Sequence, residues 1–118
     1  MNPSEIIAGA AALAEFGVSE PVRTEVGAWR ASVCAACPLN RKSGWWEKFG
    51  GYAVTLLGVR KWLRDLGRVT PDDWRLHVCA ACNCPLKLKV WCPPDIIKKH
   101  LTEEIKANLH VHCWMRIL

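Results

Sequence analysis

Apolar residues recur at helical spacing in two long stretches of the chain. The first stretch follows Pro21, and the second precedes Gly67, a residue type that commonly ends helices. Intervals of three and four residues put each set on one face, which predicts amphipathic helices over 21–33 and 52–66. The expected buried stripes are Val22, Val26, Trp29 and Val33 in the first helix and Tyr52, Leu56, Val59, Leu63 and Leu66 in the second.

Residues that favour helix starts predict several shorter helices. Asn2, Pro3 and Glu5 supply an N-cap, a first-turn proline and a capping box, which predict a helix within 1–20. The run 70–73, Thr-Pro-Asp-Asp, predicts a short helix that ends at a cysteine pair. A further helix is expected from Asp95 to about Leu101, followed by a helical turn capped by Thr102.

A different periodicity marks residues 86–92, which predict the clearest strand. Leucine and valine are expected to face inward there and lysine outward, because side chains alternate between the two faces of a strand. Cys92 shares the apolar side and is expected to be a core thiol. The inward set is Leu86, Leu88, Val90 and Cys92, and it alternates with Lys87, Lys89 and Trp91.

Two stretches of the chain are nearly identical, WRASVCAAC at 29–37 and WRLHVCAAC at 74–82. The second lies 79 − 34 = 45 residues after the first. Each is expected to be the end of a helix, with Trp and Val inward and a Cys-x-x-Cys turn at its end. Because tetrahedral zinc needs four ligands, two such turns predict two halves of one site.

Composition strengthens the metal hypothesis. The chain has 118 residues, of which 51% are hydrophobic. These values are typical of one globular domain that is small enough to be stabilised appreciably by a cross-link such as a bound metal. The apolar N-terminal run lacks a cationic start, and no apolar run approaches about 20 residues, so neither a signal peptide nor a membrane span is expected. A cytoplasmic location would keep thiols reduced, and seven cysteines then favour metal ligation over disulfides.

More thiols are available than one zinc ion needs. The candidate ligands are Cys34, Cys37, Cys79, Cys82, Cys84 and Cys113. Two sets of four compete: Cys34 and Cys37 with either Cys79 and Cys82, or Cys84 and Cys113. Zn2+ is the first candidate, while a binuclear site with shared thiolates and a 4Fe-4S cluster remain alternatives. His110 and His112 lie near Cys113 and are either ligands or exposed side chains.

The combined pattern predicts a mainly α fold with a small β element. The helices would be arranged around a cysteine-rich metal site with knuckles like those of zinc ribbons or treble clefs. Residues 1–118 form a single metal-stapled domain in this interpretation. Residues 1–20 would be an N-terminal helix that can serve as a docking arm, and residues 41–70 a helical insert between the two cysteine turns.

Charge and aromatic residues indicate surfaces for partners. The net charge of +5 is compatible with an acidic partner or nucleic acid. Candidate partner-binding residues are Trp45, Trp46, Arg60, Lys61, Arg64 and Arg68, although packed tryptophans and a solvated basic helix face are the plainer interpretations. A phosphate-cradling glycine loop, a serine nucleophile elbow and a deaminase signature are all missing, so no enzyme is expected.

The cysteine pattern resembles that of small cysteine-rich proteins encoded in phages and prophages. The resemblance spans about 30–114, and its matching residues are Cys34, Cys37, Pro38, Asn40, Cys79, Cys82, Cys84, Lys89, Val90, Pro93, Cys113 and Trp114. It implies a metal-bound module of phage origin and a part of the virion. Iron–sulfur sites in tail-tip hub proteins of lambda-like phages keep that cofactor open by analogy.

These observations together predict a non-enzymatic structural metal-binding protein. It would act as an interaction or assembly module in a multi-subunit phage tail or connector, made in the cytoplasm and incorporated into the virion. One alternative is an iron–sulfur electron carrier or sensor. The other is a zinc-dependent regulator that binds nucleic acid, and no membrane partner is expected.

Overall fold

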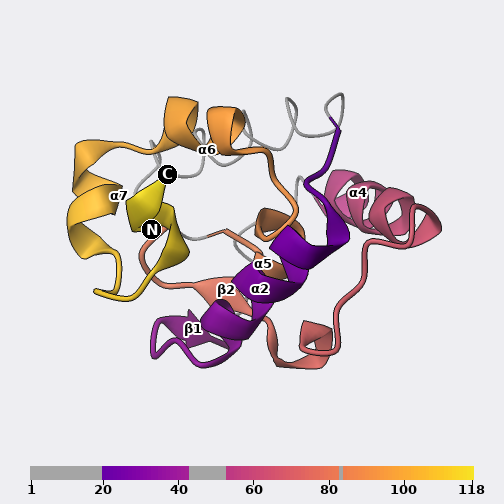
Figure 1. Ribbon diagram of the computed structural model, residues 1–118, viewed down its shortest axis with the longest axis horizontal. Helices are drawn as coiled ribbons and strands as arrows, with labels where there is room; N and C mark the ends of the chain where they lie inside the picture. Colours follow the sequence, from indigo (N-terminus) through magenta and orange to yellow (C-terminus); the bar gives the residue numbers. More distant parts are fainter. Residues whose placement is uncertain (1–19, 43–52, 83) are drawn as a thin grey trace.

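The computed structural model describes residues 20–42, 53–82 and 84–118 and is mainly helical (Figure 1). Its elements are α2 (Thr24–Ala35), β1 (Asn40–Arg41), α4 (Ala53–Asp65), η2 (Asp73–Arg75), β2 (Val78–Cys79), α5 (Leu86–Lys89), α6 (Pro94–His100), α7 (Glu103–Asn108) and η3 (Trp114–Ile117). Strands β1 and β2 form a two-stranded antiparallel sheet. The predicted class, mainly α with a small β element, is confirmed. The predicted N-terminal helix over 1–20 and the residues Trp45 and Trp46 lie outside the described residues.

Helix α2 occurs where the pattern predicts a helix, but it buries a different face. Trp29, expected to point inward, is 49% exposed. The buried residues are Gly27, Arg30, Ala31 and Cys34. A Cβ atom at Gly27 would overlap the ring of the buried Trp91, so the missing side chain lets that ring approach the helix. Because α2 packs against Trp91 through Gly27, its buried face differs from the apolar stripe that was predicted to be buried.

The strand predicted over 86–92 is wrong, because this segment forms the short helix α5 and a turn. The amide of Lys89 donates to the carbonyl of Pro85 at 3.0 Å, and the amide of Val90 donates to that of Leu86 at 3.2 Å. Leu86, Leu88, Val90, Trp91 and Cys92 are all buried. Helices α2 and α4 both pack against α5, so apolar residues on several sides of one turn are covered. The alternation of apolar residues with lysine in this segment therefore does not indicate an extended chain.

Helix α4 agrees with the prediction in type and extent. Val59 and Leu63 are buried as expected, whereas Leu66 is 45% exposed beyond the helix end. Gly67 has φ of 73°, a left-handed conformation that glycine adopts without strain. The amide of the next residue, Arg68, then donates to the carbonyl of Leu63 at 2.8 Å. Gly67 thus ends the helix and turns the chain back.

The helix predicted from Thr70 is reduced to the single turn η2. The Thr70 hydroxyl still organises this turn, since it accepts a hydrogen bond from the Asp72 amide at 3.2 Å and donates one to Asp73 Oδ1 at 2.8 Å. The chain is extended by Leu76 and pairs as β2 from Val78. The second cysteine pair therefore begins on a strand, and Trp74, expected inward, is 77% exposed.

The C-terminal third follows the predicted capping signals. Helix α6 begins at Pro94, and α7 begins after Thr102, whose hydroxyl accepts a hydrogen bond from the Ile105 amide at 3.1 Å. Ile97 and Ile105 contribute to the same core as Leu63 and Trp91.

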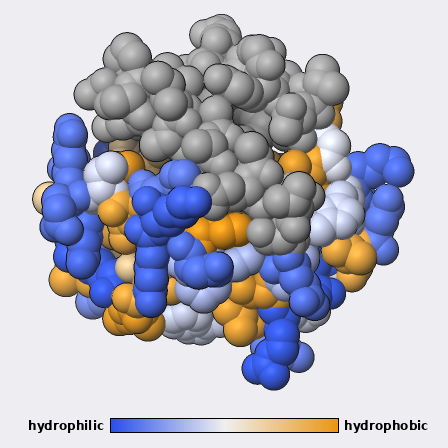
Figure 2. Space-filling model, turned by 90° about the horizontal axis from the view of Figure 1, so that it is seen from above, coloured by the Kyte–Doolittle hydropathy of each residue, from blue (hydrophilic) through white to orange (hydrophobic). Residues whose placement is uncertain are grey.

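In the view from above, hydrophilic side chains project from the described surface, with hydrophobic groups between them (Figure 2). None of the helices in the described ranges is long and apolar enough to cross a membrane.

Candidate metal centre

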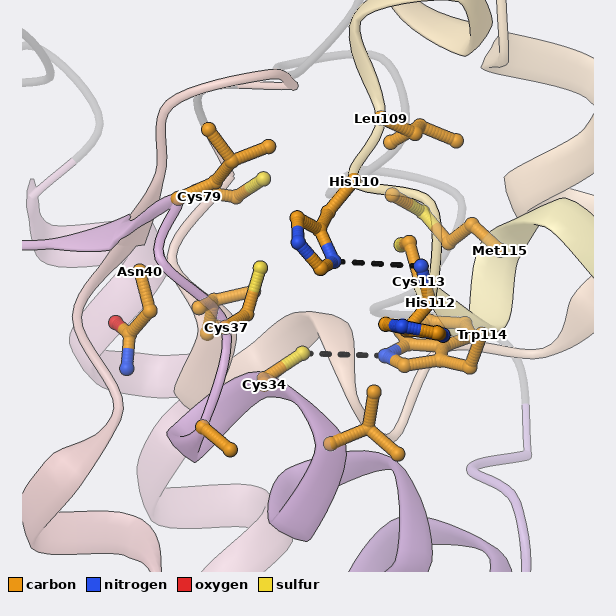
Figure 3. A pocket seen from close by; sticks show the side chains of 14 residues that line it. Cys34, Cys37, Asn40, Cys79, Leu109, His110, His112, Cys113, Trp114 and Met115 are labelled. Atoms are coloured by element: carbon orange, nitrogen blue, oxygen red, sulfur yellow. Dashed lines mark hydrogen bonds between the residues drawn. The ribbon is translucent and has the colours of Figure 1, made fainter.

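Four cysteines from three parts of the chain are among the residues that line one cavity of about 300 Å3, which we call the thiol cavity. Cys34 and Cys37 lie at the end of α2, Cys79 lies on β2, and Cys113 directly precedes η3. Their side chains surround a common space, in which the ring of His110 also lies (Figure 3). The cavity thus collects thiols that are 79 − 34 = 45 and 113 − 79 = 34 residues apart.

Backbone pairing brings these segments together. After α2, the amide of Cys37 donates to the carbonyl of Cys34 at 3.0 Å, and the amide of Asn40 donates to that of Cys37 at 3.1 Å. This turn leads into β1, where Asn40 pairs with Cys79. The Asn40 side chain donates to the carbonyl of Arg75 at 2.7 Å and accepts from the amide of His77 at 2.9 Å. Asn40 therefore joins the two copies of the repeated sequence.

Three of the four sulfurs receive N–H groups. The indole Nε1 of Trp114 donates to Cys34 Sγ at 3.1 Å. The backbone amides of Ala81 and Cys82 donate to Cys79, and that of Met115 donates to Cys113. Hydrogen bonds of this kind favour the charged thiolate, which is the form that binds metals.

Burial raises the pKa values of these thiols, whereas the hydrogen bonds that their sulfurs accept lower them. Burial raises the pKa of Cys34 to about 12 and also raises that of Cys113, although the N–H donors act against the shift. At Cys79 the bond from the Cys82 thiol outweighs burial, and with the two backbone amides it lowers the pKa to about 6. Cys79 therefore ionises more readily than Cys34 and Cys113 do.

Behind Cys79 lies a second group of sulfurs, Cys82 and Cys84, neither of which lines the thiol cavity. The Cys82 thiol bonds to both neighbouring sulfurs, and these bonds together with burial keep its pKa well above the ordinary value. The bond from Cys82, assisted by the Lys89 ammonium, lowers the pKa of Cys84 to about 6. Burial disfavours the Lys89 charge, but the sulfurs of Cys84, Cys82 and Cys92 outweigh it and raise the pKa of Lys89.

A buried arginine supports the opposite wall of the thiol cavity. Arg30 is 3% exposed, and its Nη1 donates to the carbonyls of Val90 at 3.2 Å and Cys92 at 2.7 Å. Its guanidinium lies 4.3 Å from the centre of the Trp114 ring, within cation–π range. Burial lowers the pKa of Arg30, while the nearby sulfurs of Cys92 and Cys34 oppose that shift. Arg30 therefore places a positive charge beside a site that would become negative when thiolates form.

The structure groups the six candidate ligands differently from either set of four that the sequence indicated. Cys79 joins Cys34, Cys37 and Cys113, because the β1–β2 register turns Cys79 toward the end of α2. Cys82 and Cys84 contact one another and Cys79 instead. Cys92 is 4% exposed, as expected for a core thiol, and both His110 and His112 line the thiol cavity.

The four sulfurs of the thiol cavity are near one another without forming a closed ligand cage. Within the described residues, no three His, Cys, Asp or Glu side chains meet closely enough to hold a metal ion as they stand. The donor chemistry nevertheless fits a thiophilic metal, since cysteine sulfurs are the ligands that zinc and iron–sulfur clusters take and three of these four accept N–H groups. Metal binding would require the four side chains to move toward a common centre or to surround a larger cofactor.

The supporting roles of two residues were not identified from the sequence. Arg30 belongs to the repeated Trp-Arg pair, but its equivalent Arg75 is exposed, so the repeat alone does not reveal its role. Asn40 is named from the sequence only as part of the cysteine-pattern resemblance, and its two side-chain bonds depend on a partner segment 35 to 37 residues away.

The predicted basic stripe on α4 is divided in the structure. Arg60 and Arg64 are exposed, Arg68 is half-buried, and Lys61 pairs with Asp65 at 3.2 Å. Arg68 Nε donates to the carbonyl of Val22 at 3.1 Å, so this side chain is partly fixed to the segment before α2.

Comparison of the chain with known protein families, curated proteins and solved structures found no match.

Proposed function

We propose that this protein is a non-enzymatic metal-binding module whose metal staples the fold and whose surface docks onto other proteins. The residues that would hold the metal are Cys34, Cys37, Cys79 and Cys113. Their arrangement around one cavity is the observation that carries the proposal. An all-cysteine zinc site is typically closed and structural, which is why the metal is assigned to folding and not to catalysis.

N–H donors and one nearby cation support thiolate ligation, against the burial that raises the pKa of Cys34 and Cys113. N–H groups reach the sulfurs of Cys34, Cys79 and Cys113, and the Arg30 guanidinium lies beside Trp114. Four thiolates around Zn2+ carry a net charge of 2−, and buried charge is costly unless nearby donors and opposite charge offset it. These groups supply that compensation from within the fold.

An iron–sulfur cluster is the second candidate, and the separation of the four sulfurs favours it. A Zn–S bond of about 2.3 Å and tetrahedral geometry require sulfurs roughly 3.8 Å apart. Zinc would therefore have to draw together sulfurs that line a wider space and do not meet closely enough to hold an ion as they stand. A 4Fe-4S cluster is also held by four cysteines and would occupy part of that space without such closure.

Exposed aromatic and aliphatic side chains support the docking role. Trp29 is 49% exposed and Trp74 77% exposed, and tryptophan is enriched among the residues that dominate binding energy at interfaces. Val111 and Ile117 add exposed apolar surface near the C-terminus.

The proposed setting is a phage tail or connector, as the cysteine-pattern resemblance implies, and mass spectrometry of purified virions tests it. Absence of the protein from the particles would contradict that setting.

Anaerobic purification followed by metal analysis and an absorption spectrum tests the metal assignment. The expected result is one zinc ion per chain and no visible absorption, whereas a brown protein with iron and sulfide would select the cluster. Cys113→Ala should reduce metal content by at least half, because it removes one of four ligands.

The matched control is Cys92→Ala, which removes a buried thiol that does not line the thiol cavity. This variant should retain the full metal content. Equal loss of metal in both variants, or no metal in the anaerobically purified wild type, would overturn the proposed centre.

A further inference from the structure

A second, smaller pocket lies between α4, α5 and η2 and has a volume of about 40 Å3. Its polar lining consists of Arg60, Arg64, Arg68, Lys87 and Asp73, and we call it the basic pocket. It shares no lining residue with the thiol cavity. A pocket this small admits one compact polar group, whereas pockets for drug-sized ligands measure about 300–1,000 Å3.

The fold brings the cations of the basic pocket together. Arg60 and Arg64 lie one turn apart on the same side of α4. Arg68 is brought back beside them by the turn at Gly67, and its Nε and Nη1 donate to the carbonyls of Val22 at 3.1 Å and Leu66 at 3.3 Å. Lys87 comes from α5, which packs against α4.

The charges of the basic pocket are not balanced within it. Four cations face one lining carboxylate, that of Asp73, whose Oδ1 already accepts a hydrogen bond from the Thr70 hydroxyl at 2.8 Å. In the described part of the chain, none of the four cations forms an ion pair. Burial and the charge of Arg60 lower the pKa of half-buried Lys87, and Asp73 only partly offsets these effects. Such a group of cations is stabilised by an added anion.

We propose that the basic pocket binds a phosphate group, either as a free anion or as part of a nucleic-acid backbone. Arginine suits this ligand because its planar guanidinium can donate two parallel hydrogen bonds to phosphate oxygens. The exposed Arg60 and Arg64 would supply those donors, Lys87 would add a point charge, and partly fixed Arg68 would orient the group. This inference is independent of the metal centre.

The test is a titration of the purified protein with inorganic phosphate and, separately, with a 12-nucleotide single-stranded DNA, at constant ionic strength. Arg64→Gln should weaken binding of both probes at least about tenfold, since a charge-assisted hydrogen bond contributes roughly 1.5–3 kcal/mol. When the oligonucleotide titration is repeated at several salt concentrations, the slope of log K against log salt should be shallower in Arg64→Gln by about 0.7, because one phosphate is no longer neutralised.

Lys61→Gln is the matched control, because it removes one positive charge from the same helix outside the basic pocket. It should change affinity less than about twofold. Tighter binding of the oligonucleotide than of phosphate would assign the pocket to a nucleic-acid backbone, and the reverse would assign it to a free anion. Failure of both probes to bind, or equal weakening by the two variants in chains with unchanged circular dichroism, would overturn the proposal.

Discussion

At the scale of single residues, Gly27 on α2 has the least room for a side chain among the described glycines. The residue has no side chain, and the Trp91 ring occupies the space that a Cβ atom would need. Both sides of this contact are rigid, because one is helix backbone and the other is a ring that is 1% exposed. The sequence pattern pointed to a different buried face here, since amphipathic periodicity counts apolar side chains and cannot detect a face that packs through glycine and arginine.

Gly27→Ala should lower the free energy of unfolding by about 2 kcal/mol, because the added methyl group forces Trp91 out of its position. Gly58→Ala on α4 is the control, since nothing lies within 4 Å of its Cβ position. Alanine there should stabilise the helix by about 0.5–1 kcal/mol. Urea denaturation of the two variants gives both values, and equal effects of the same sign would contradict this account.

Cys92 should make the metal-free protein sensitive to alkaline pH. Burial raises its pKa from 9.0 to about 11, so the folded state holds the thiol proton more tightly than the unfolded chain does. The resulting stability is fully present below pH 9 and is lost as the pH rises through about 11. Two pKa units correspond to roughly 2–3 kcal/mol.

Cys92→Ala removes this contribution. Urea unfolding under reducing conditions between pH 8.5 and 11.5 should therefore show the wild type losing roughly 2 kcal/mol more than the variant. A constant difference between the two proteins across this pH range would show that the thiol stays protonated equally well in both states.

At the scale of elements, the short strands β1 and β2 determine which cysteines meet. Their pairing of Asn40 with Cys79 brings the second cysteine pair to the end of α2. The capping signals at Gly67 and Thr102 depend on neighbouring residues in the chain, and they are readable from the sequence. A pairing of two-residue strands separated by more than 35 residues leaves no periodic signal, so the choice among six cysteines could not be predicted.

The side chain of Asn40 is expected to hold this pairing. Asn40→Ala removes the bonds to the Arg75 carbonyl and the His77 amide, and should cost about 2 kcal/mol of unfolding free energy. Arg41→Ala, on the neighbouring exposed residue of the same strand, should cost less than about 0.5 kcal/mol. Thermal unfolding, monitored by circular dichroism, measures the loss of stability in each variant. The same small loss in both would mean that the backbone pairing needs no side-chain support.

At the scale of the whole molecule, the thiol cavity joins segments that lie far apart in the sequence. Cys34 and Cys37 follow α2, Cys79 follows η2, and Cys113 follows α7, so one metal would tie together both copies of the repeat and the C-terminus. The duplicated Cys-x-x-Cys motif predicted that two cysteine pairs meet, whereas the thiol cavity takes both cysteines of the first pair and only Cys79 of the second. The contribution of Cys113 depends on how α6 and α7 fold back over the core, which short motifs do not encode.

If the metal is the staple, its removal should destabilise the whole fold cooperatively. A ligand that binds only the folded state at about 1,000 times its dissociation constant adds about 4 kcal/mol of stability. Treatment with a strong chelator should therefore lower the free energy of unfolding by about that amount, with a single transition followed by both near- and far-ultraviolet circular dichroism. The chelator should have little effect on Cys113→Ala, which already lacks one ligand, whereas an unchanged wild-type transition would mean that the hydrophobic core holds the segments together without metal.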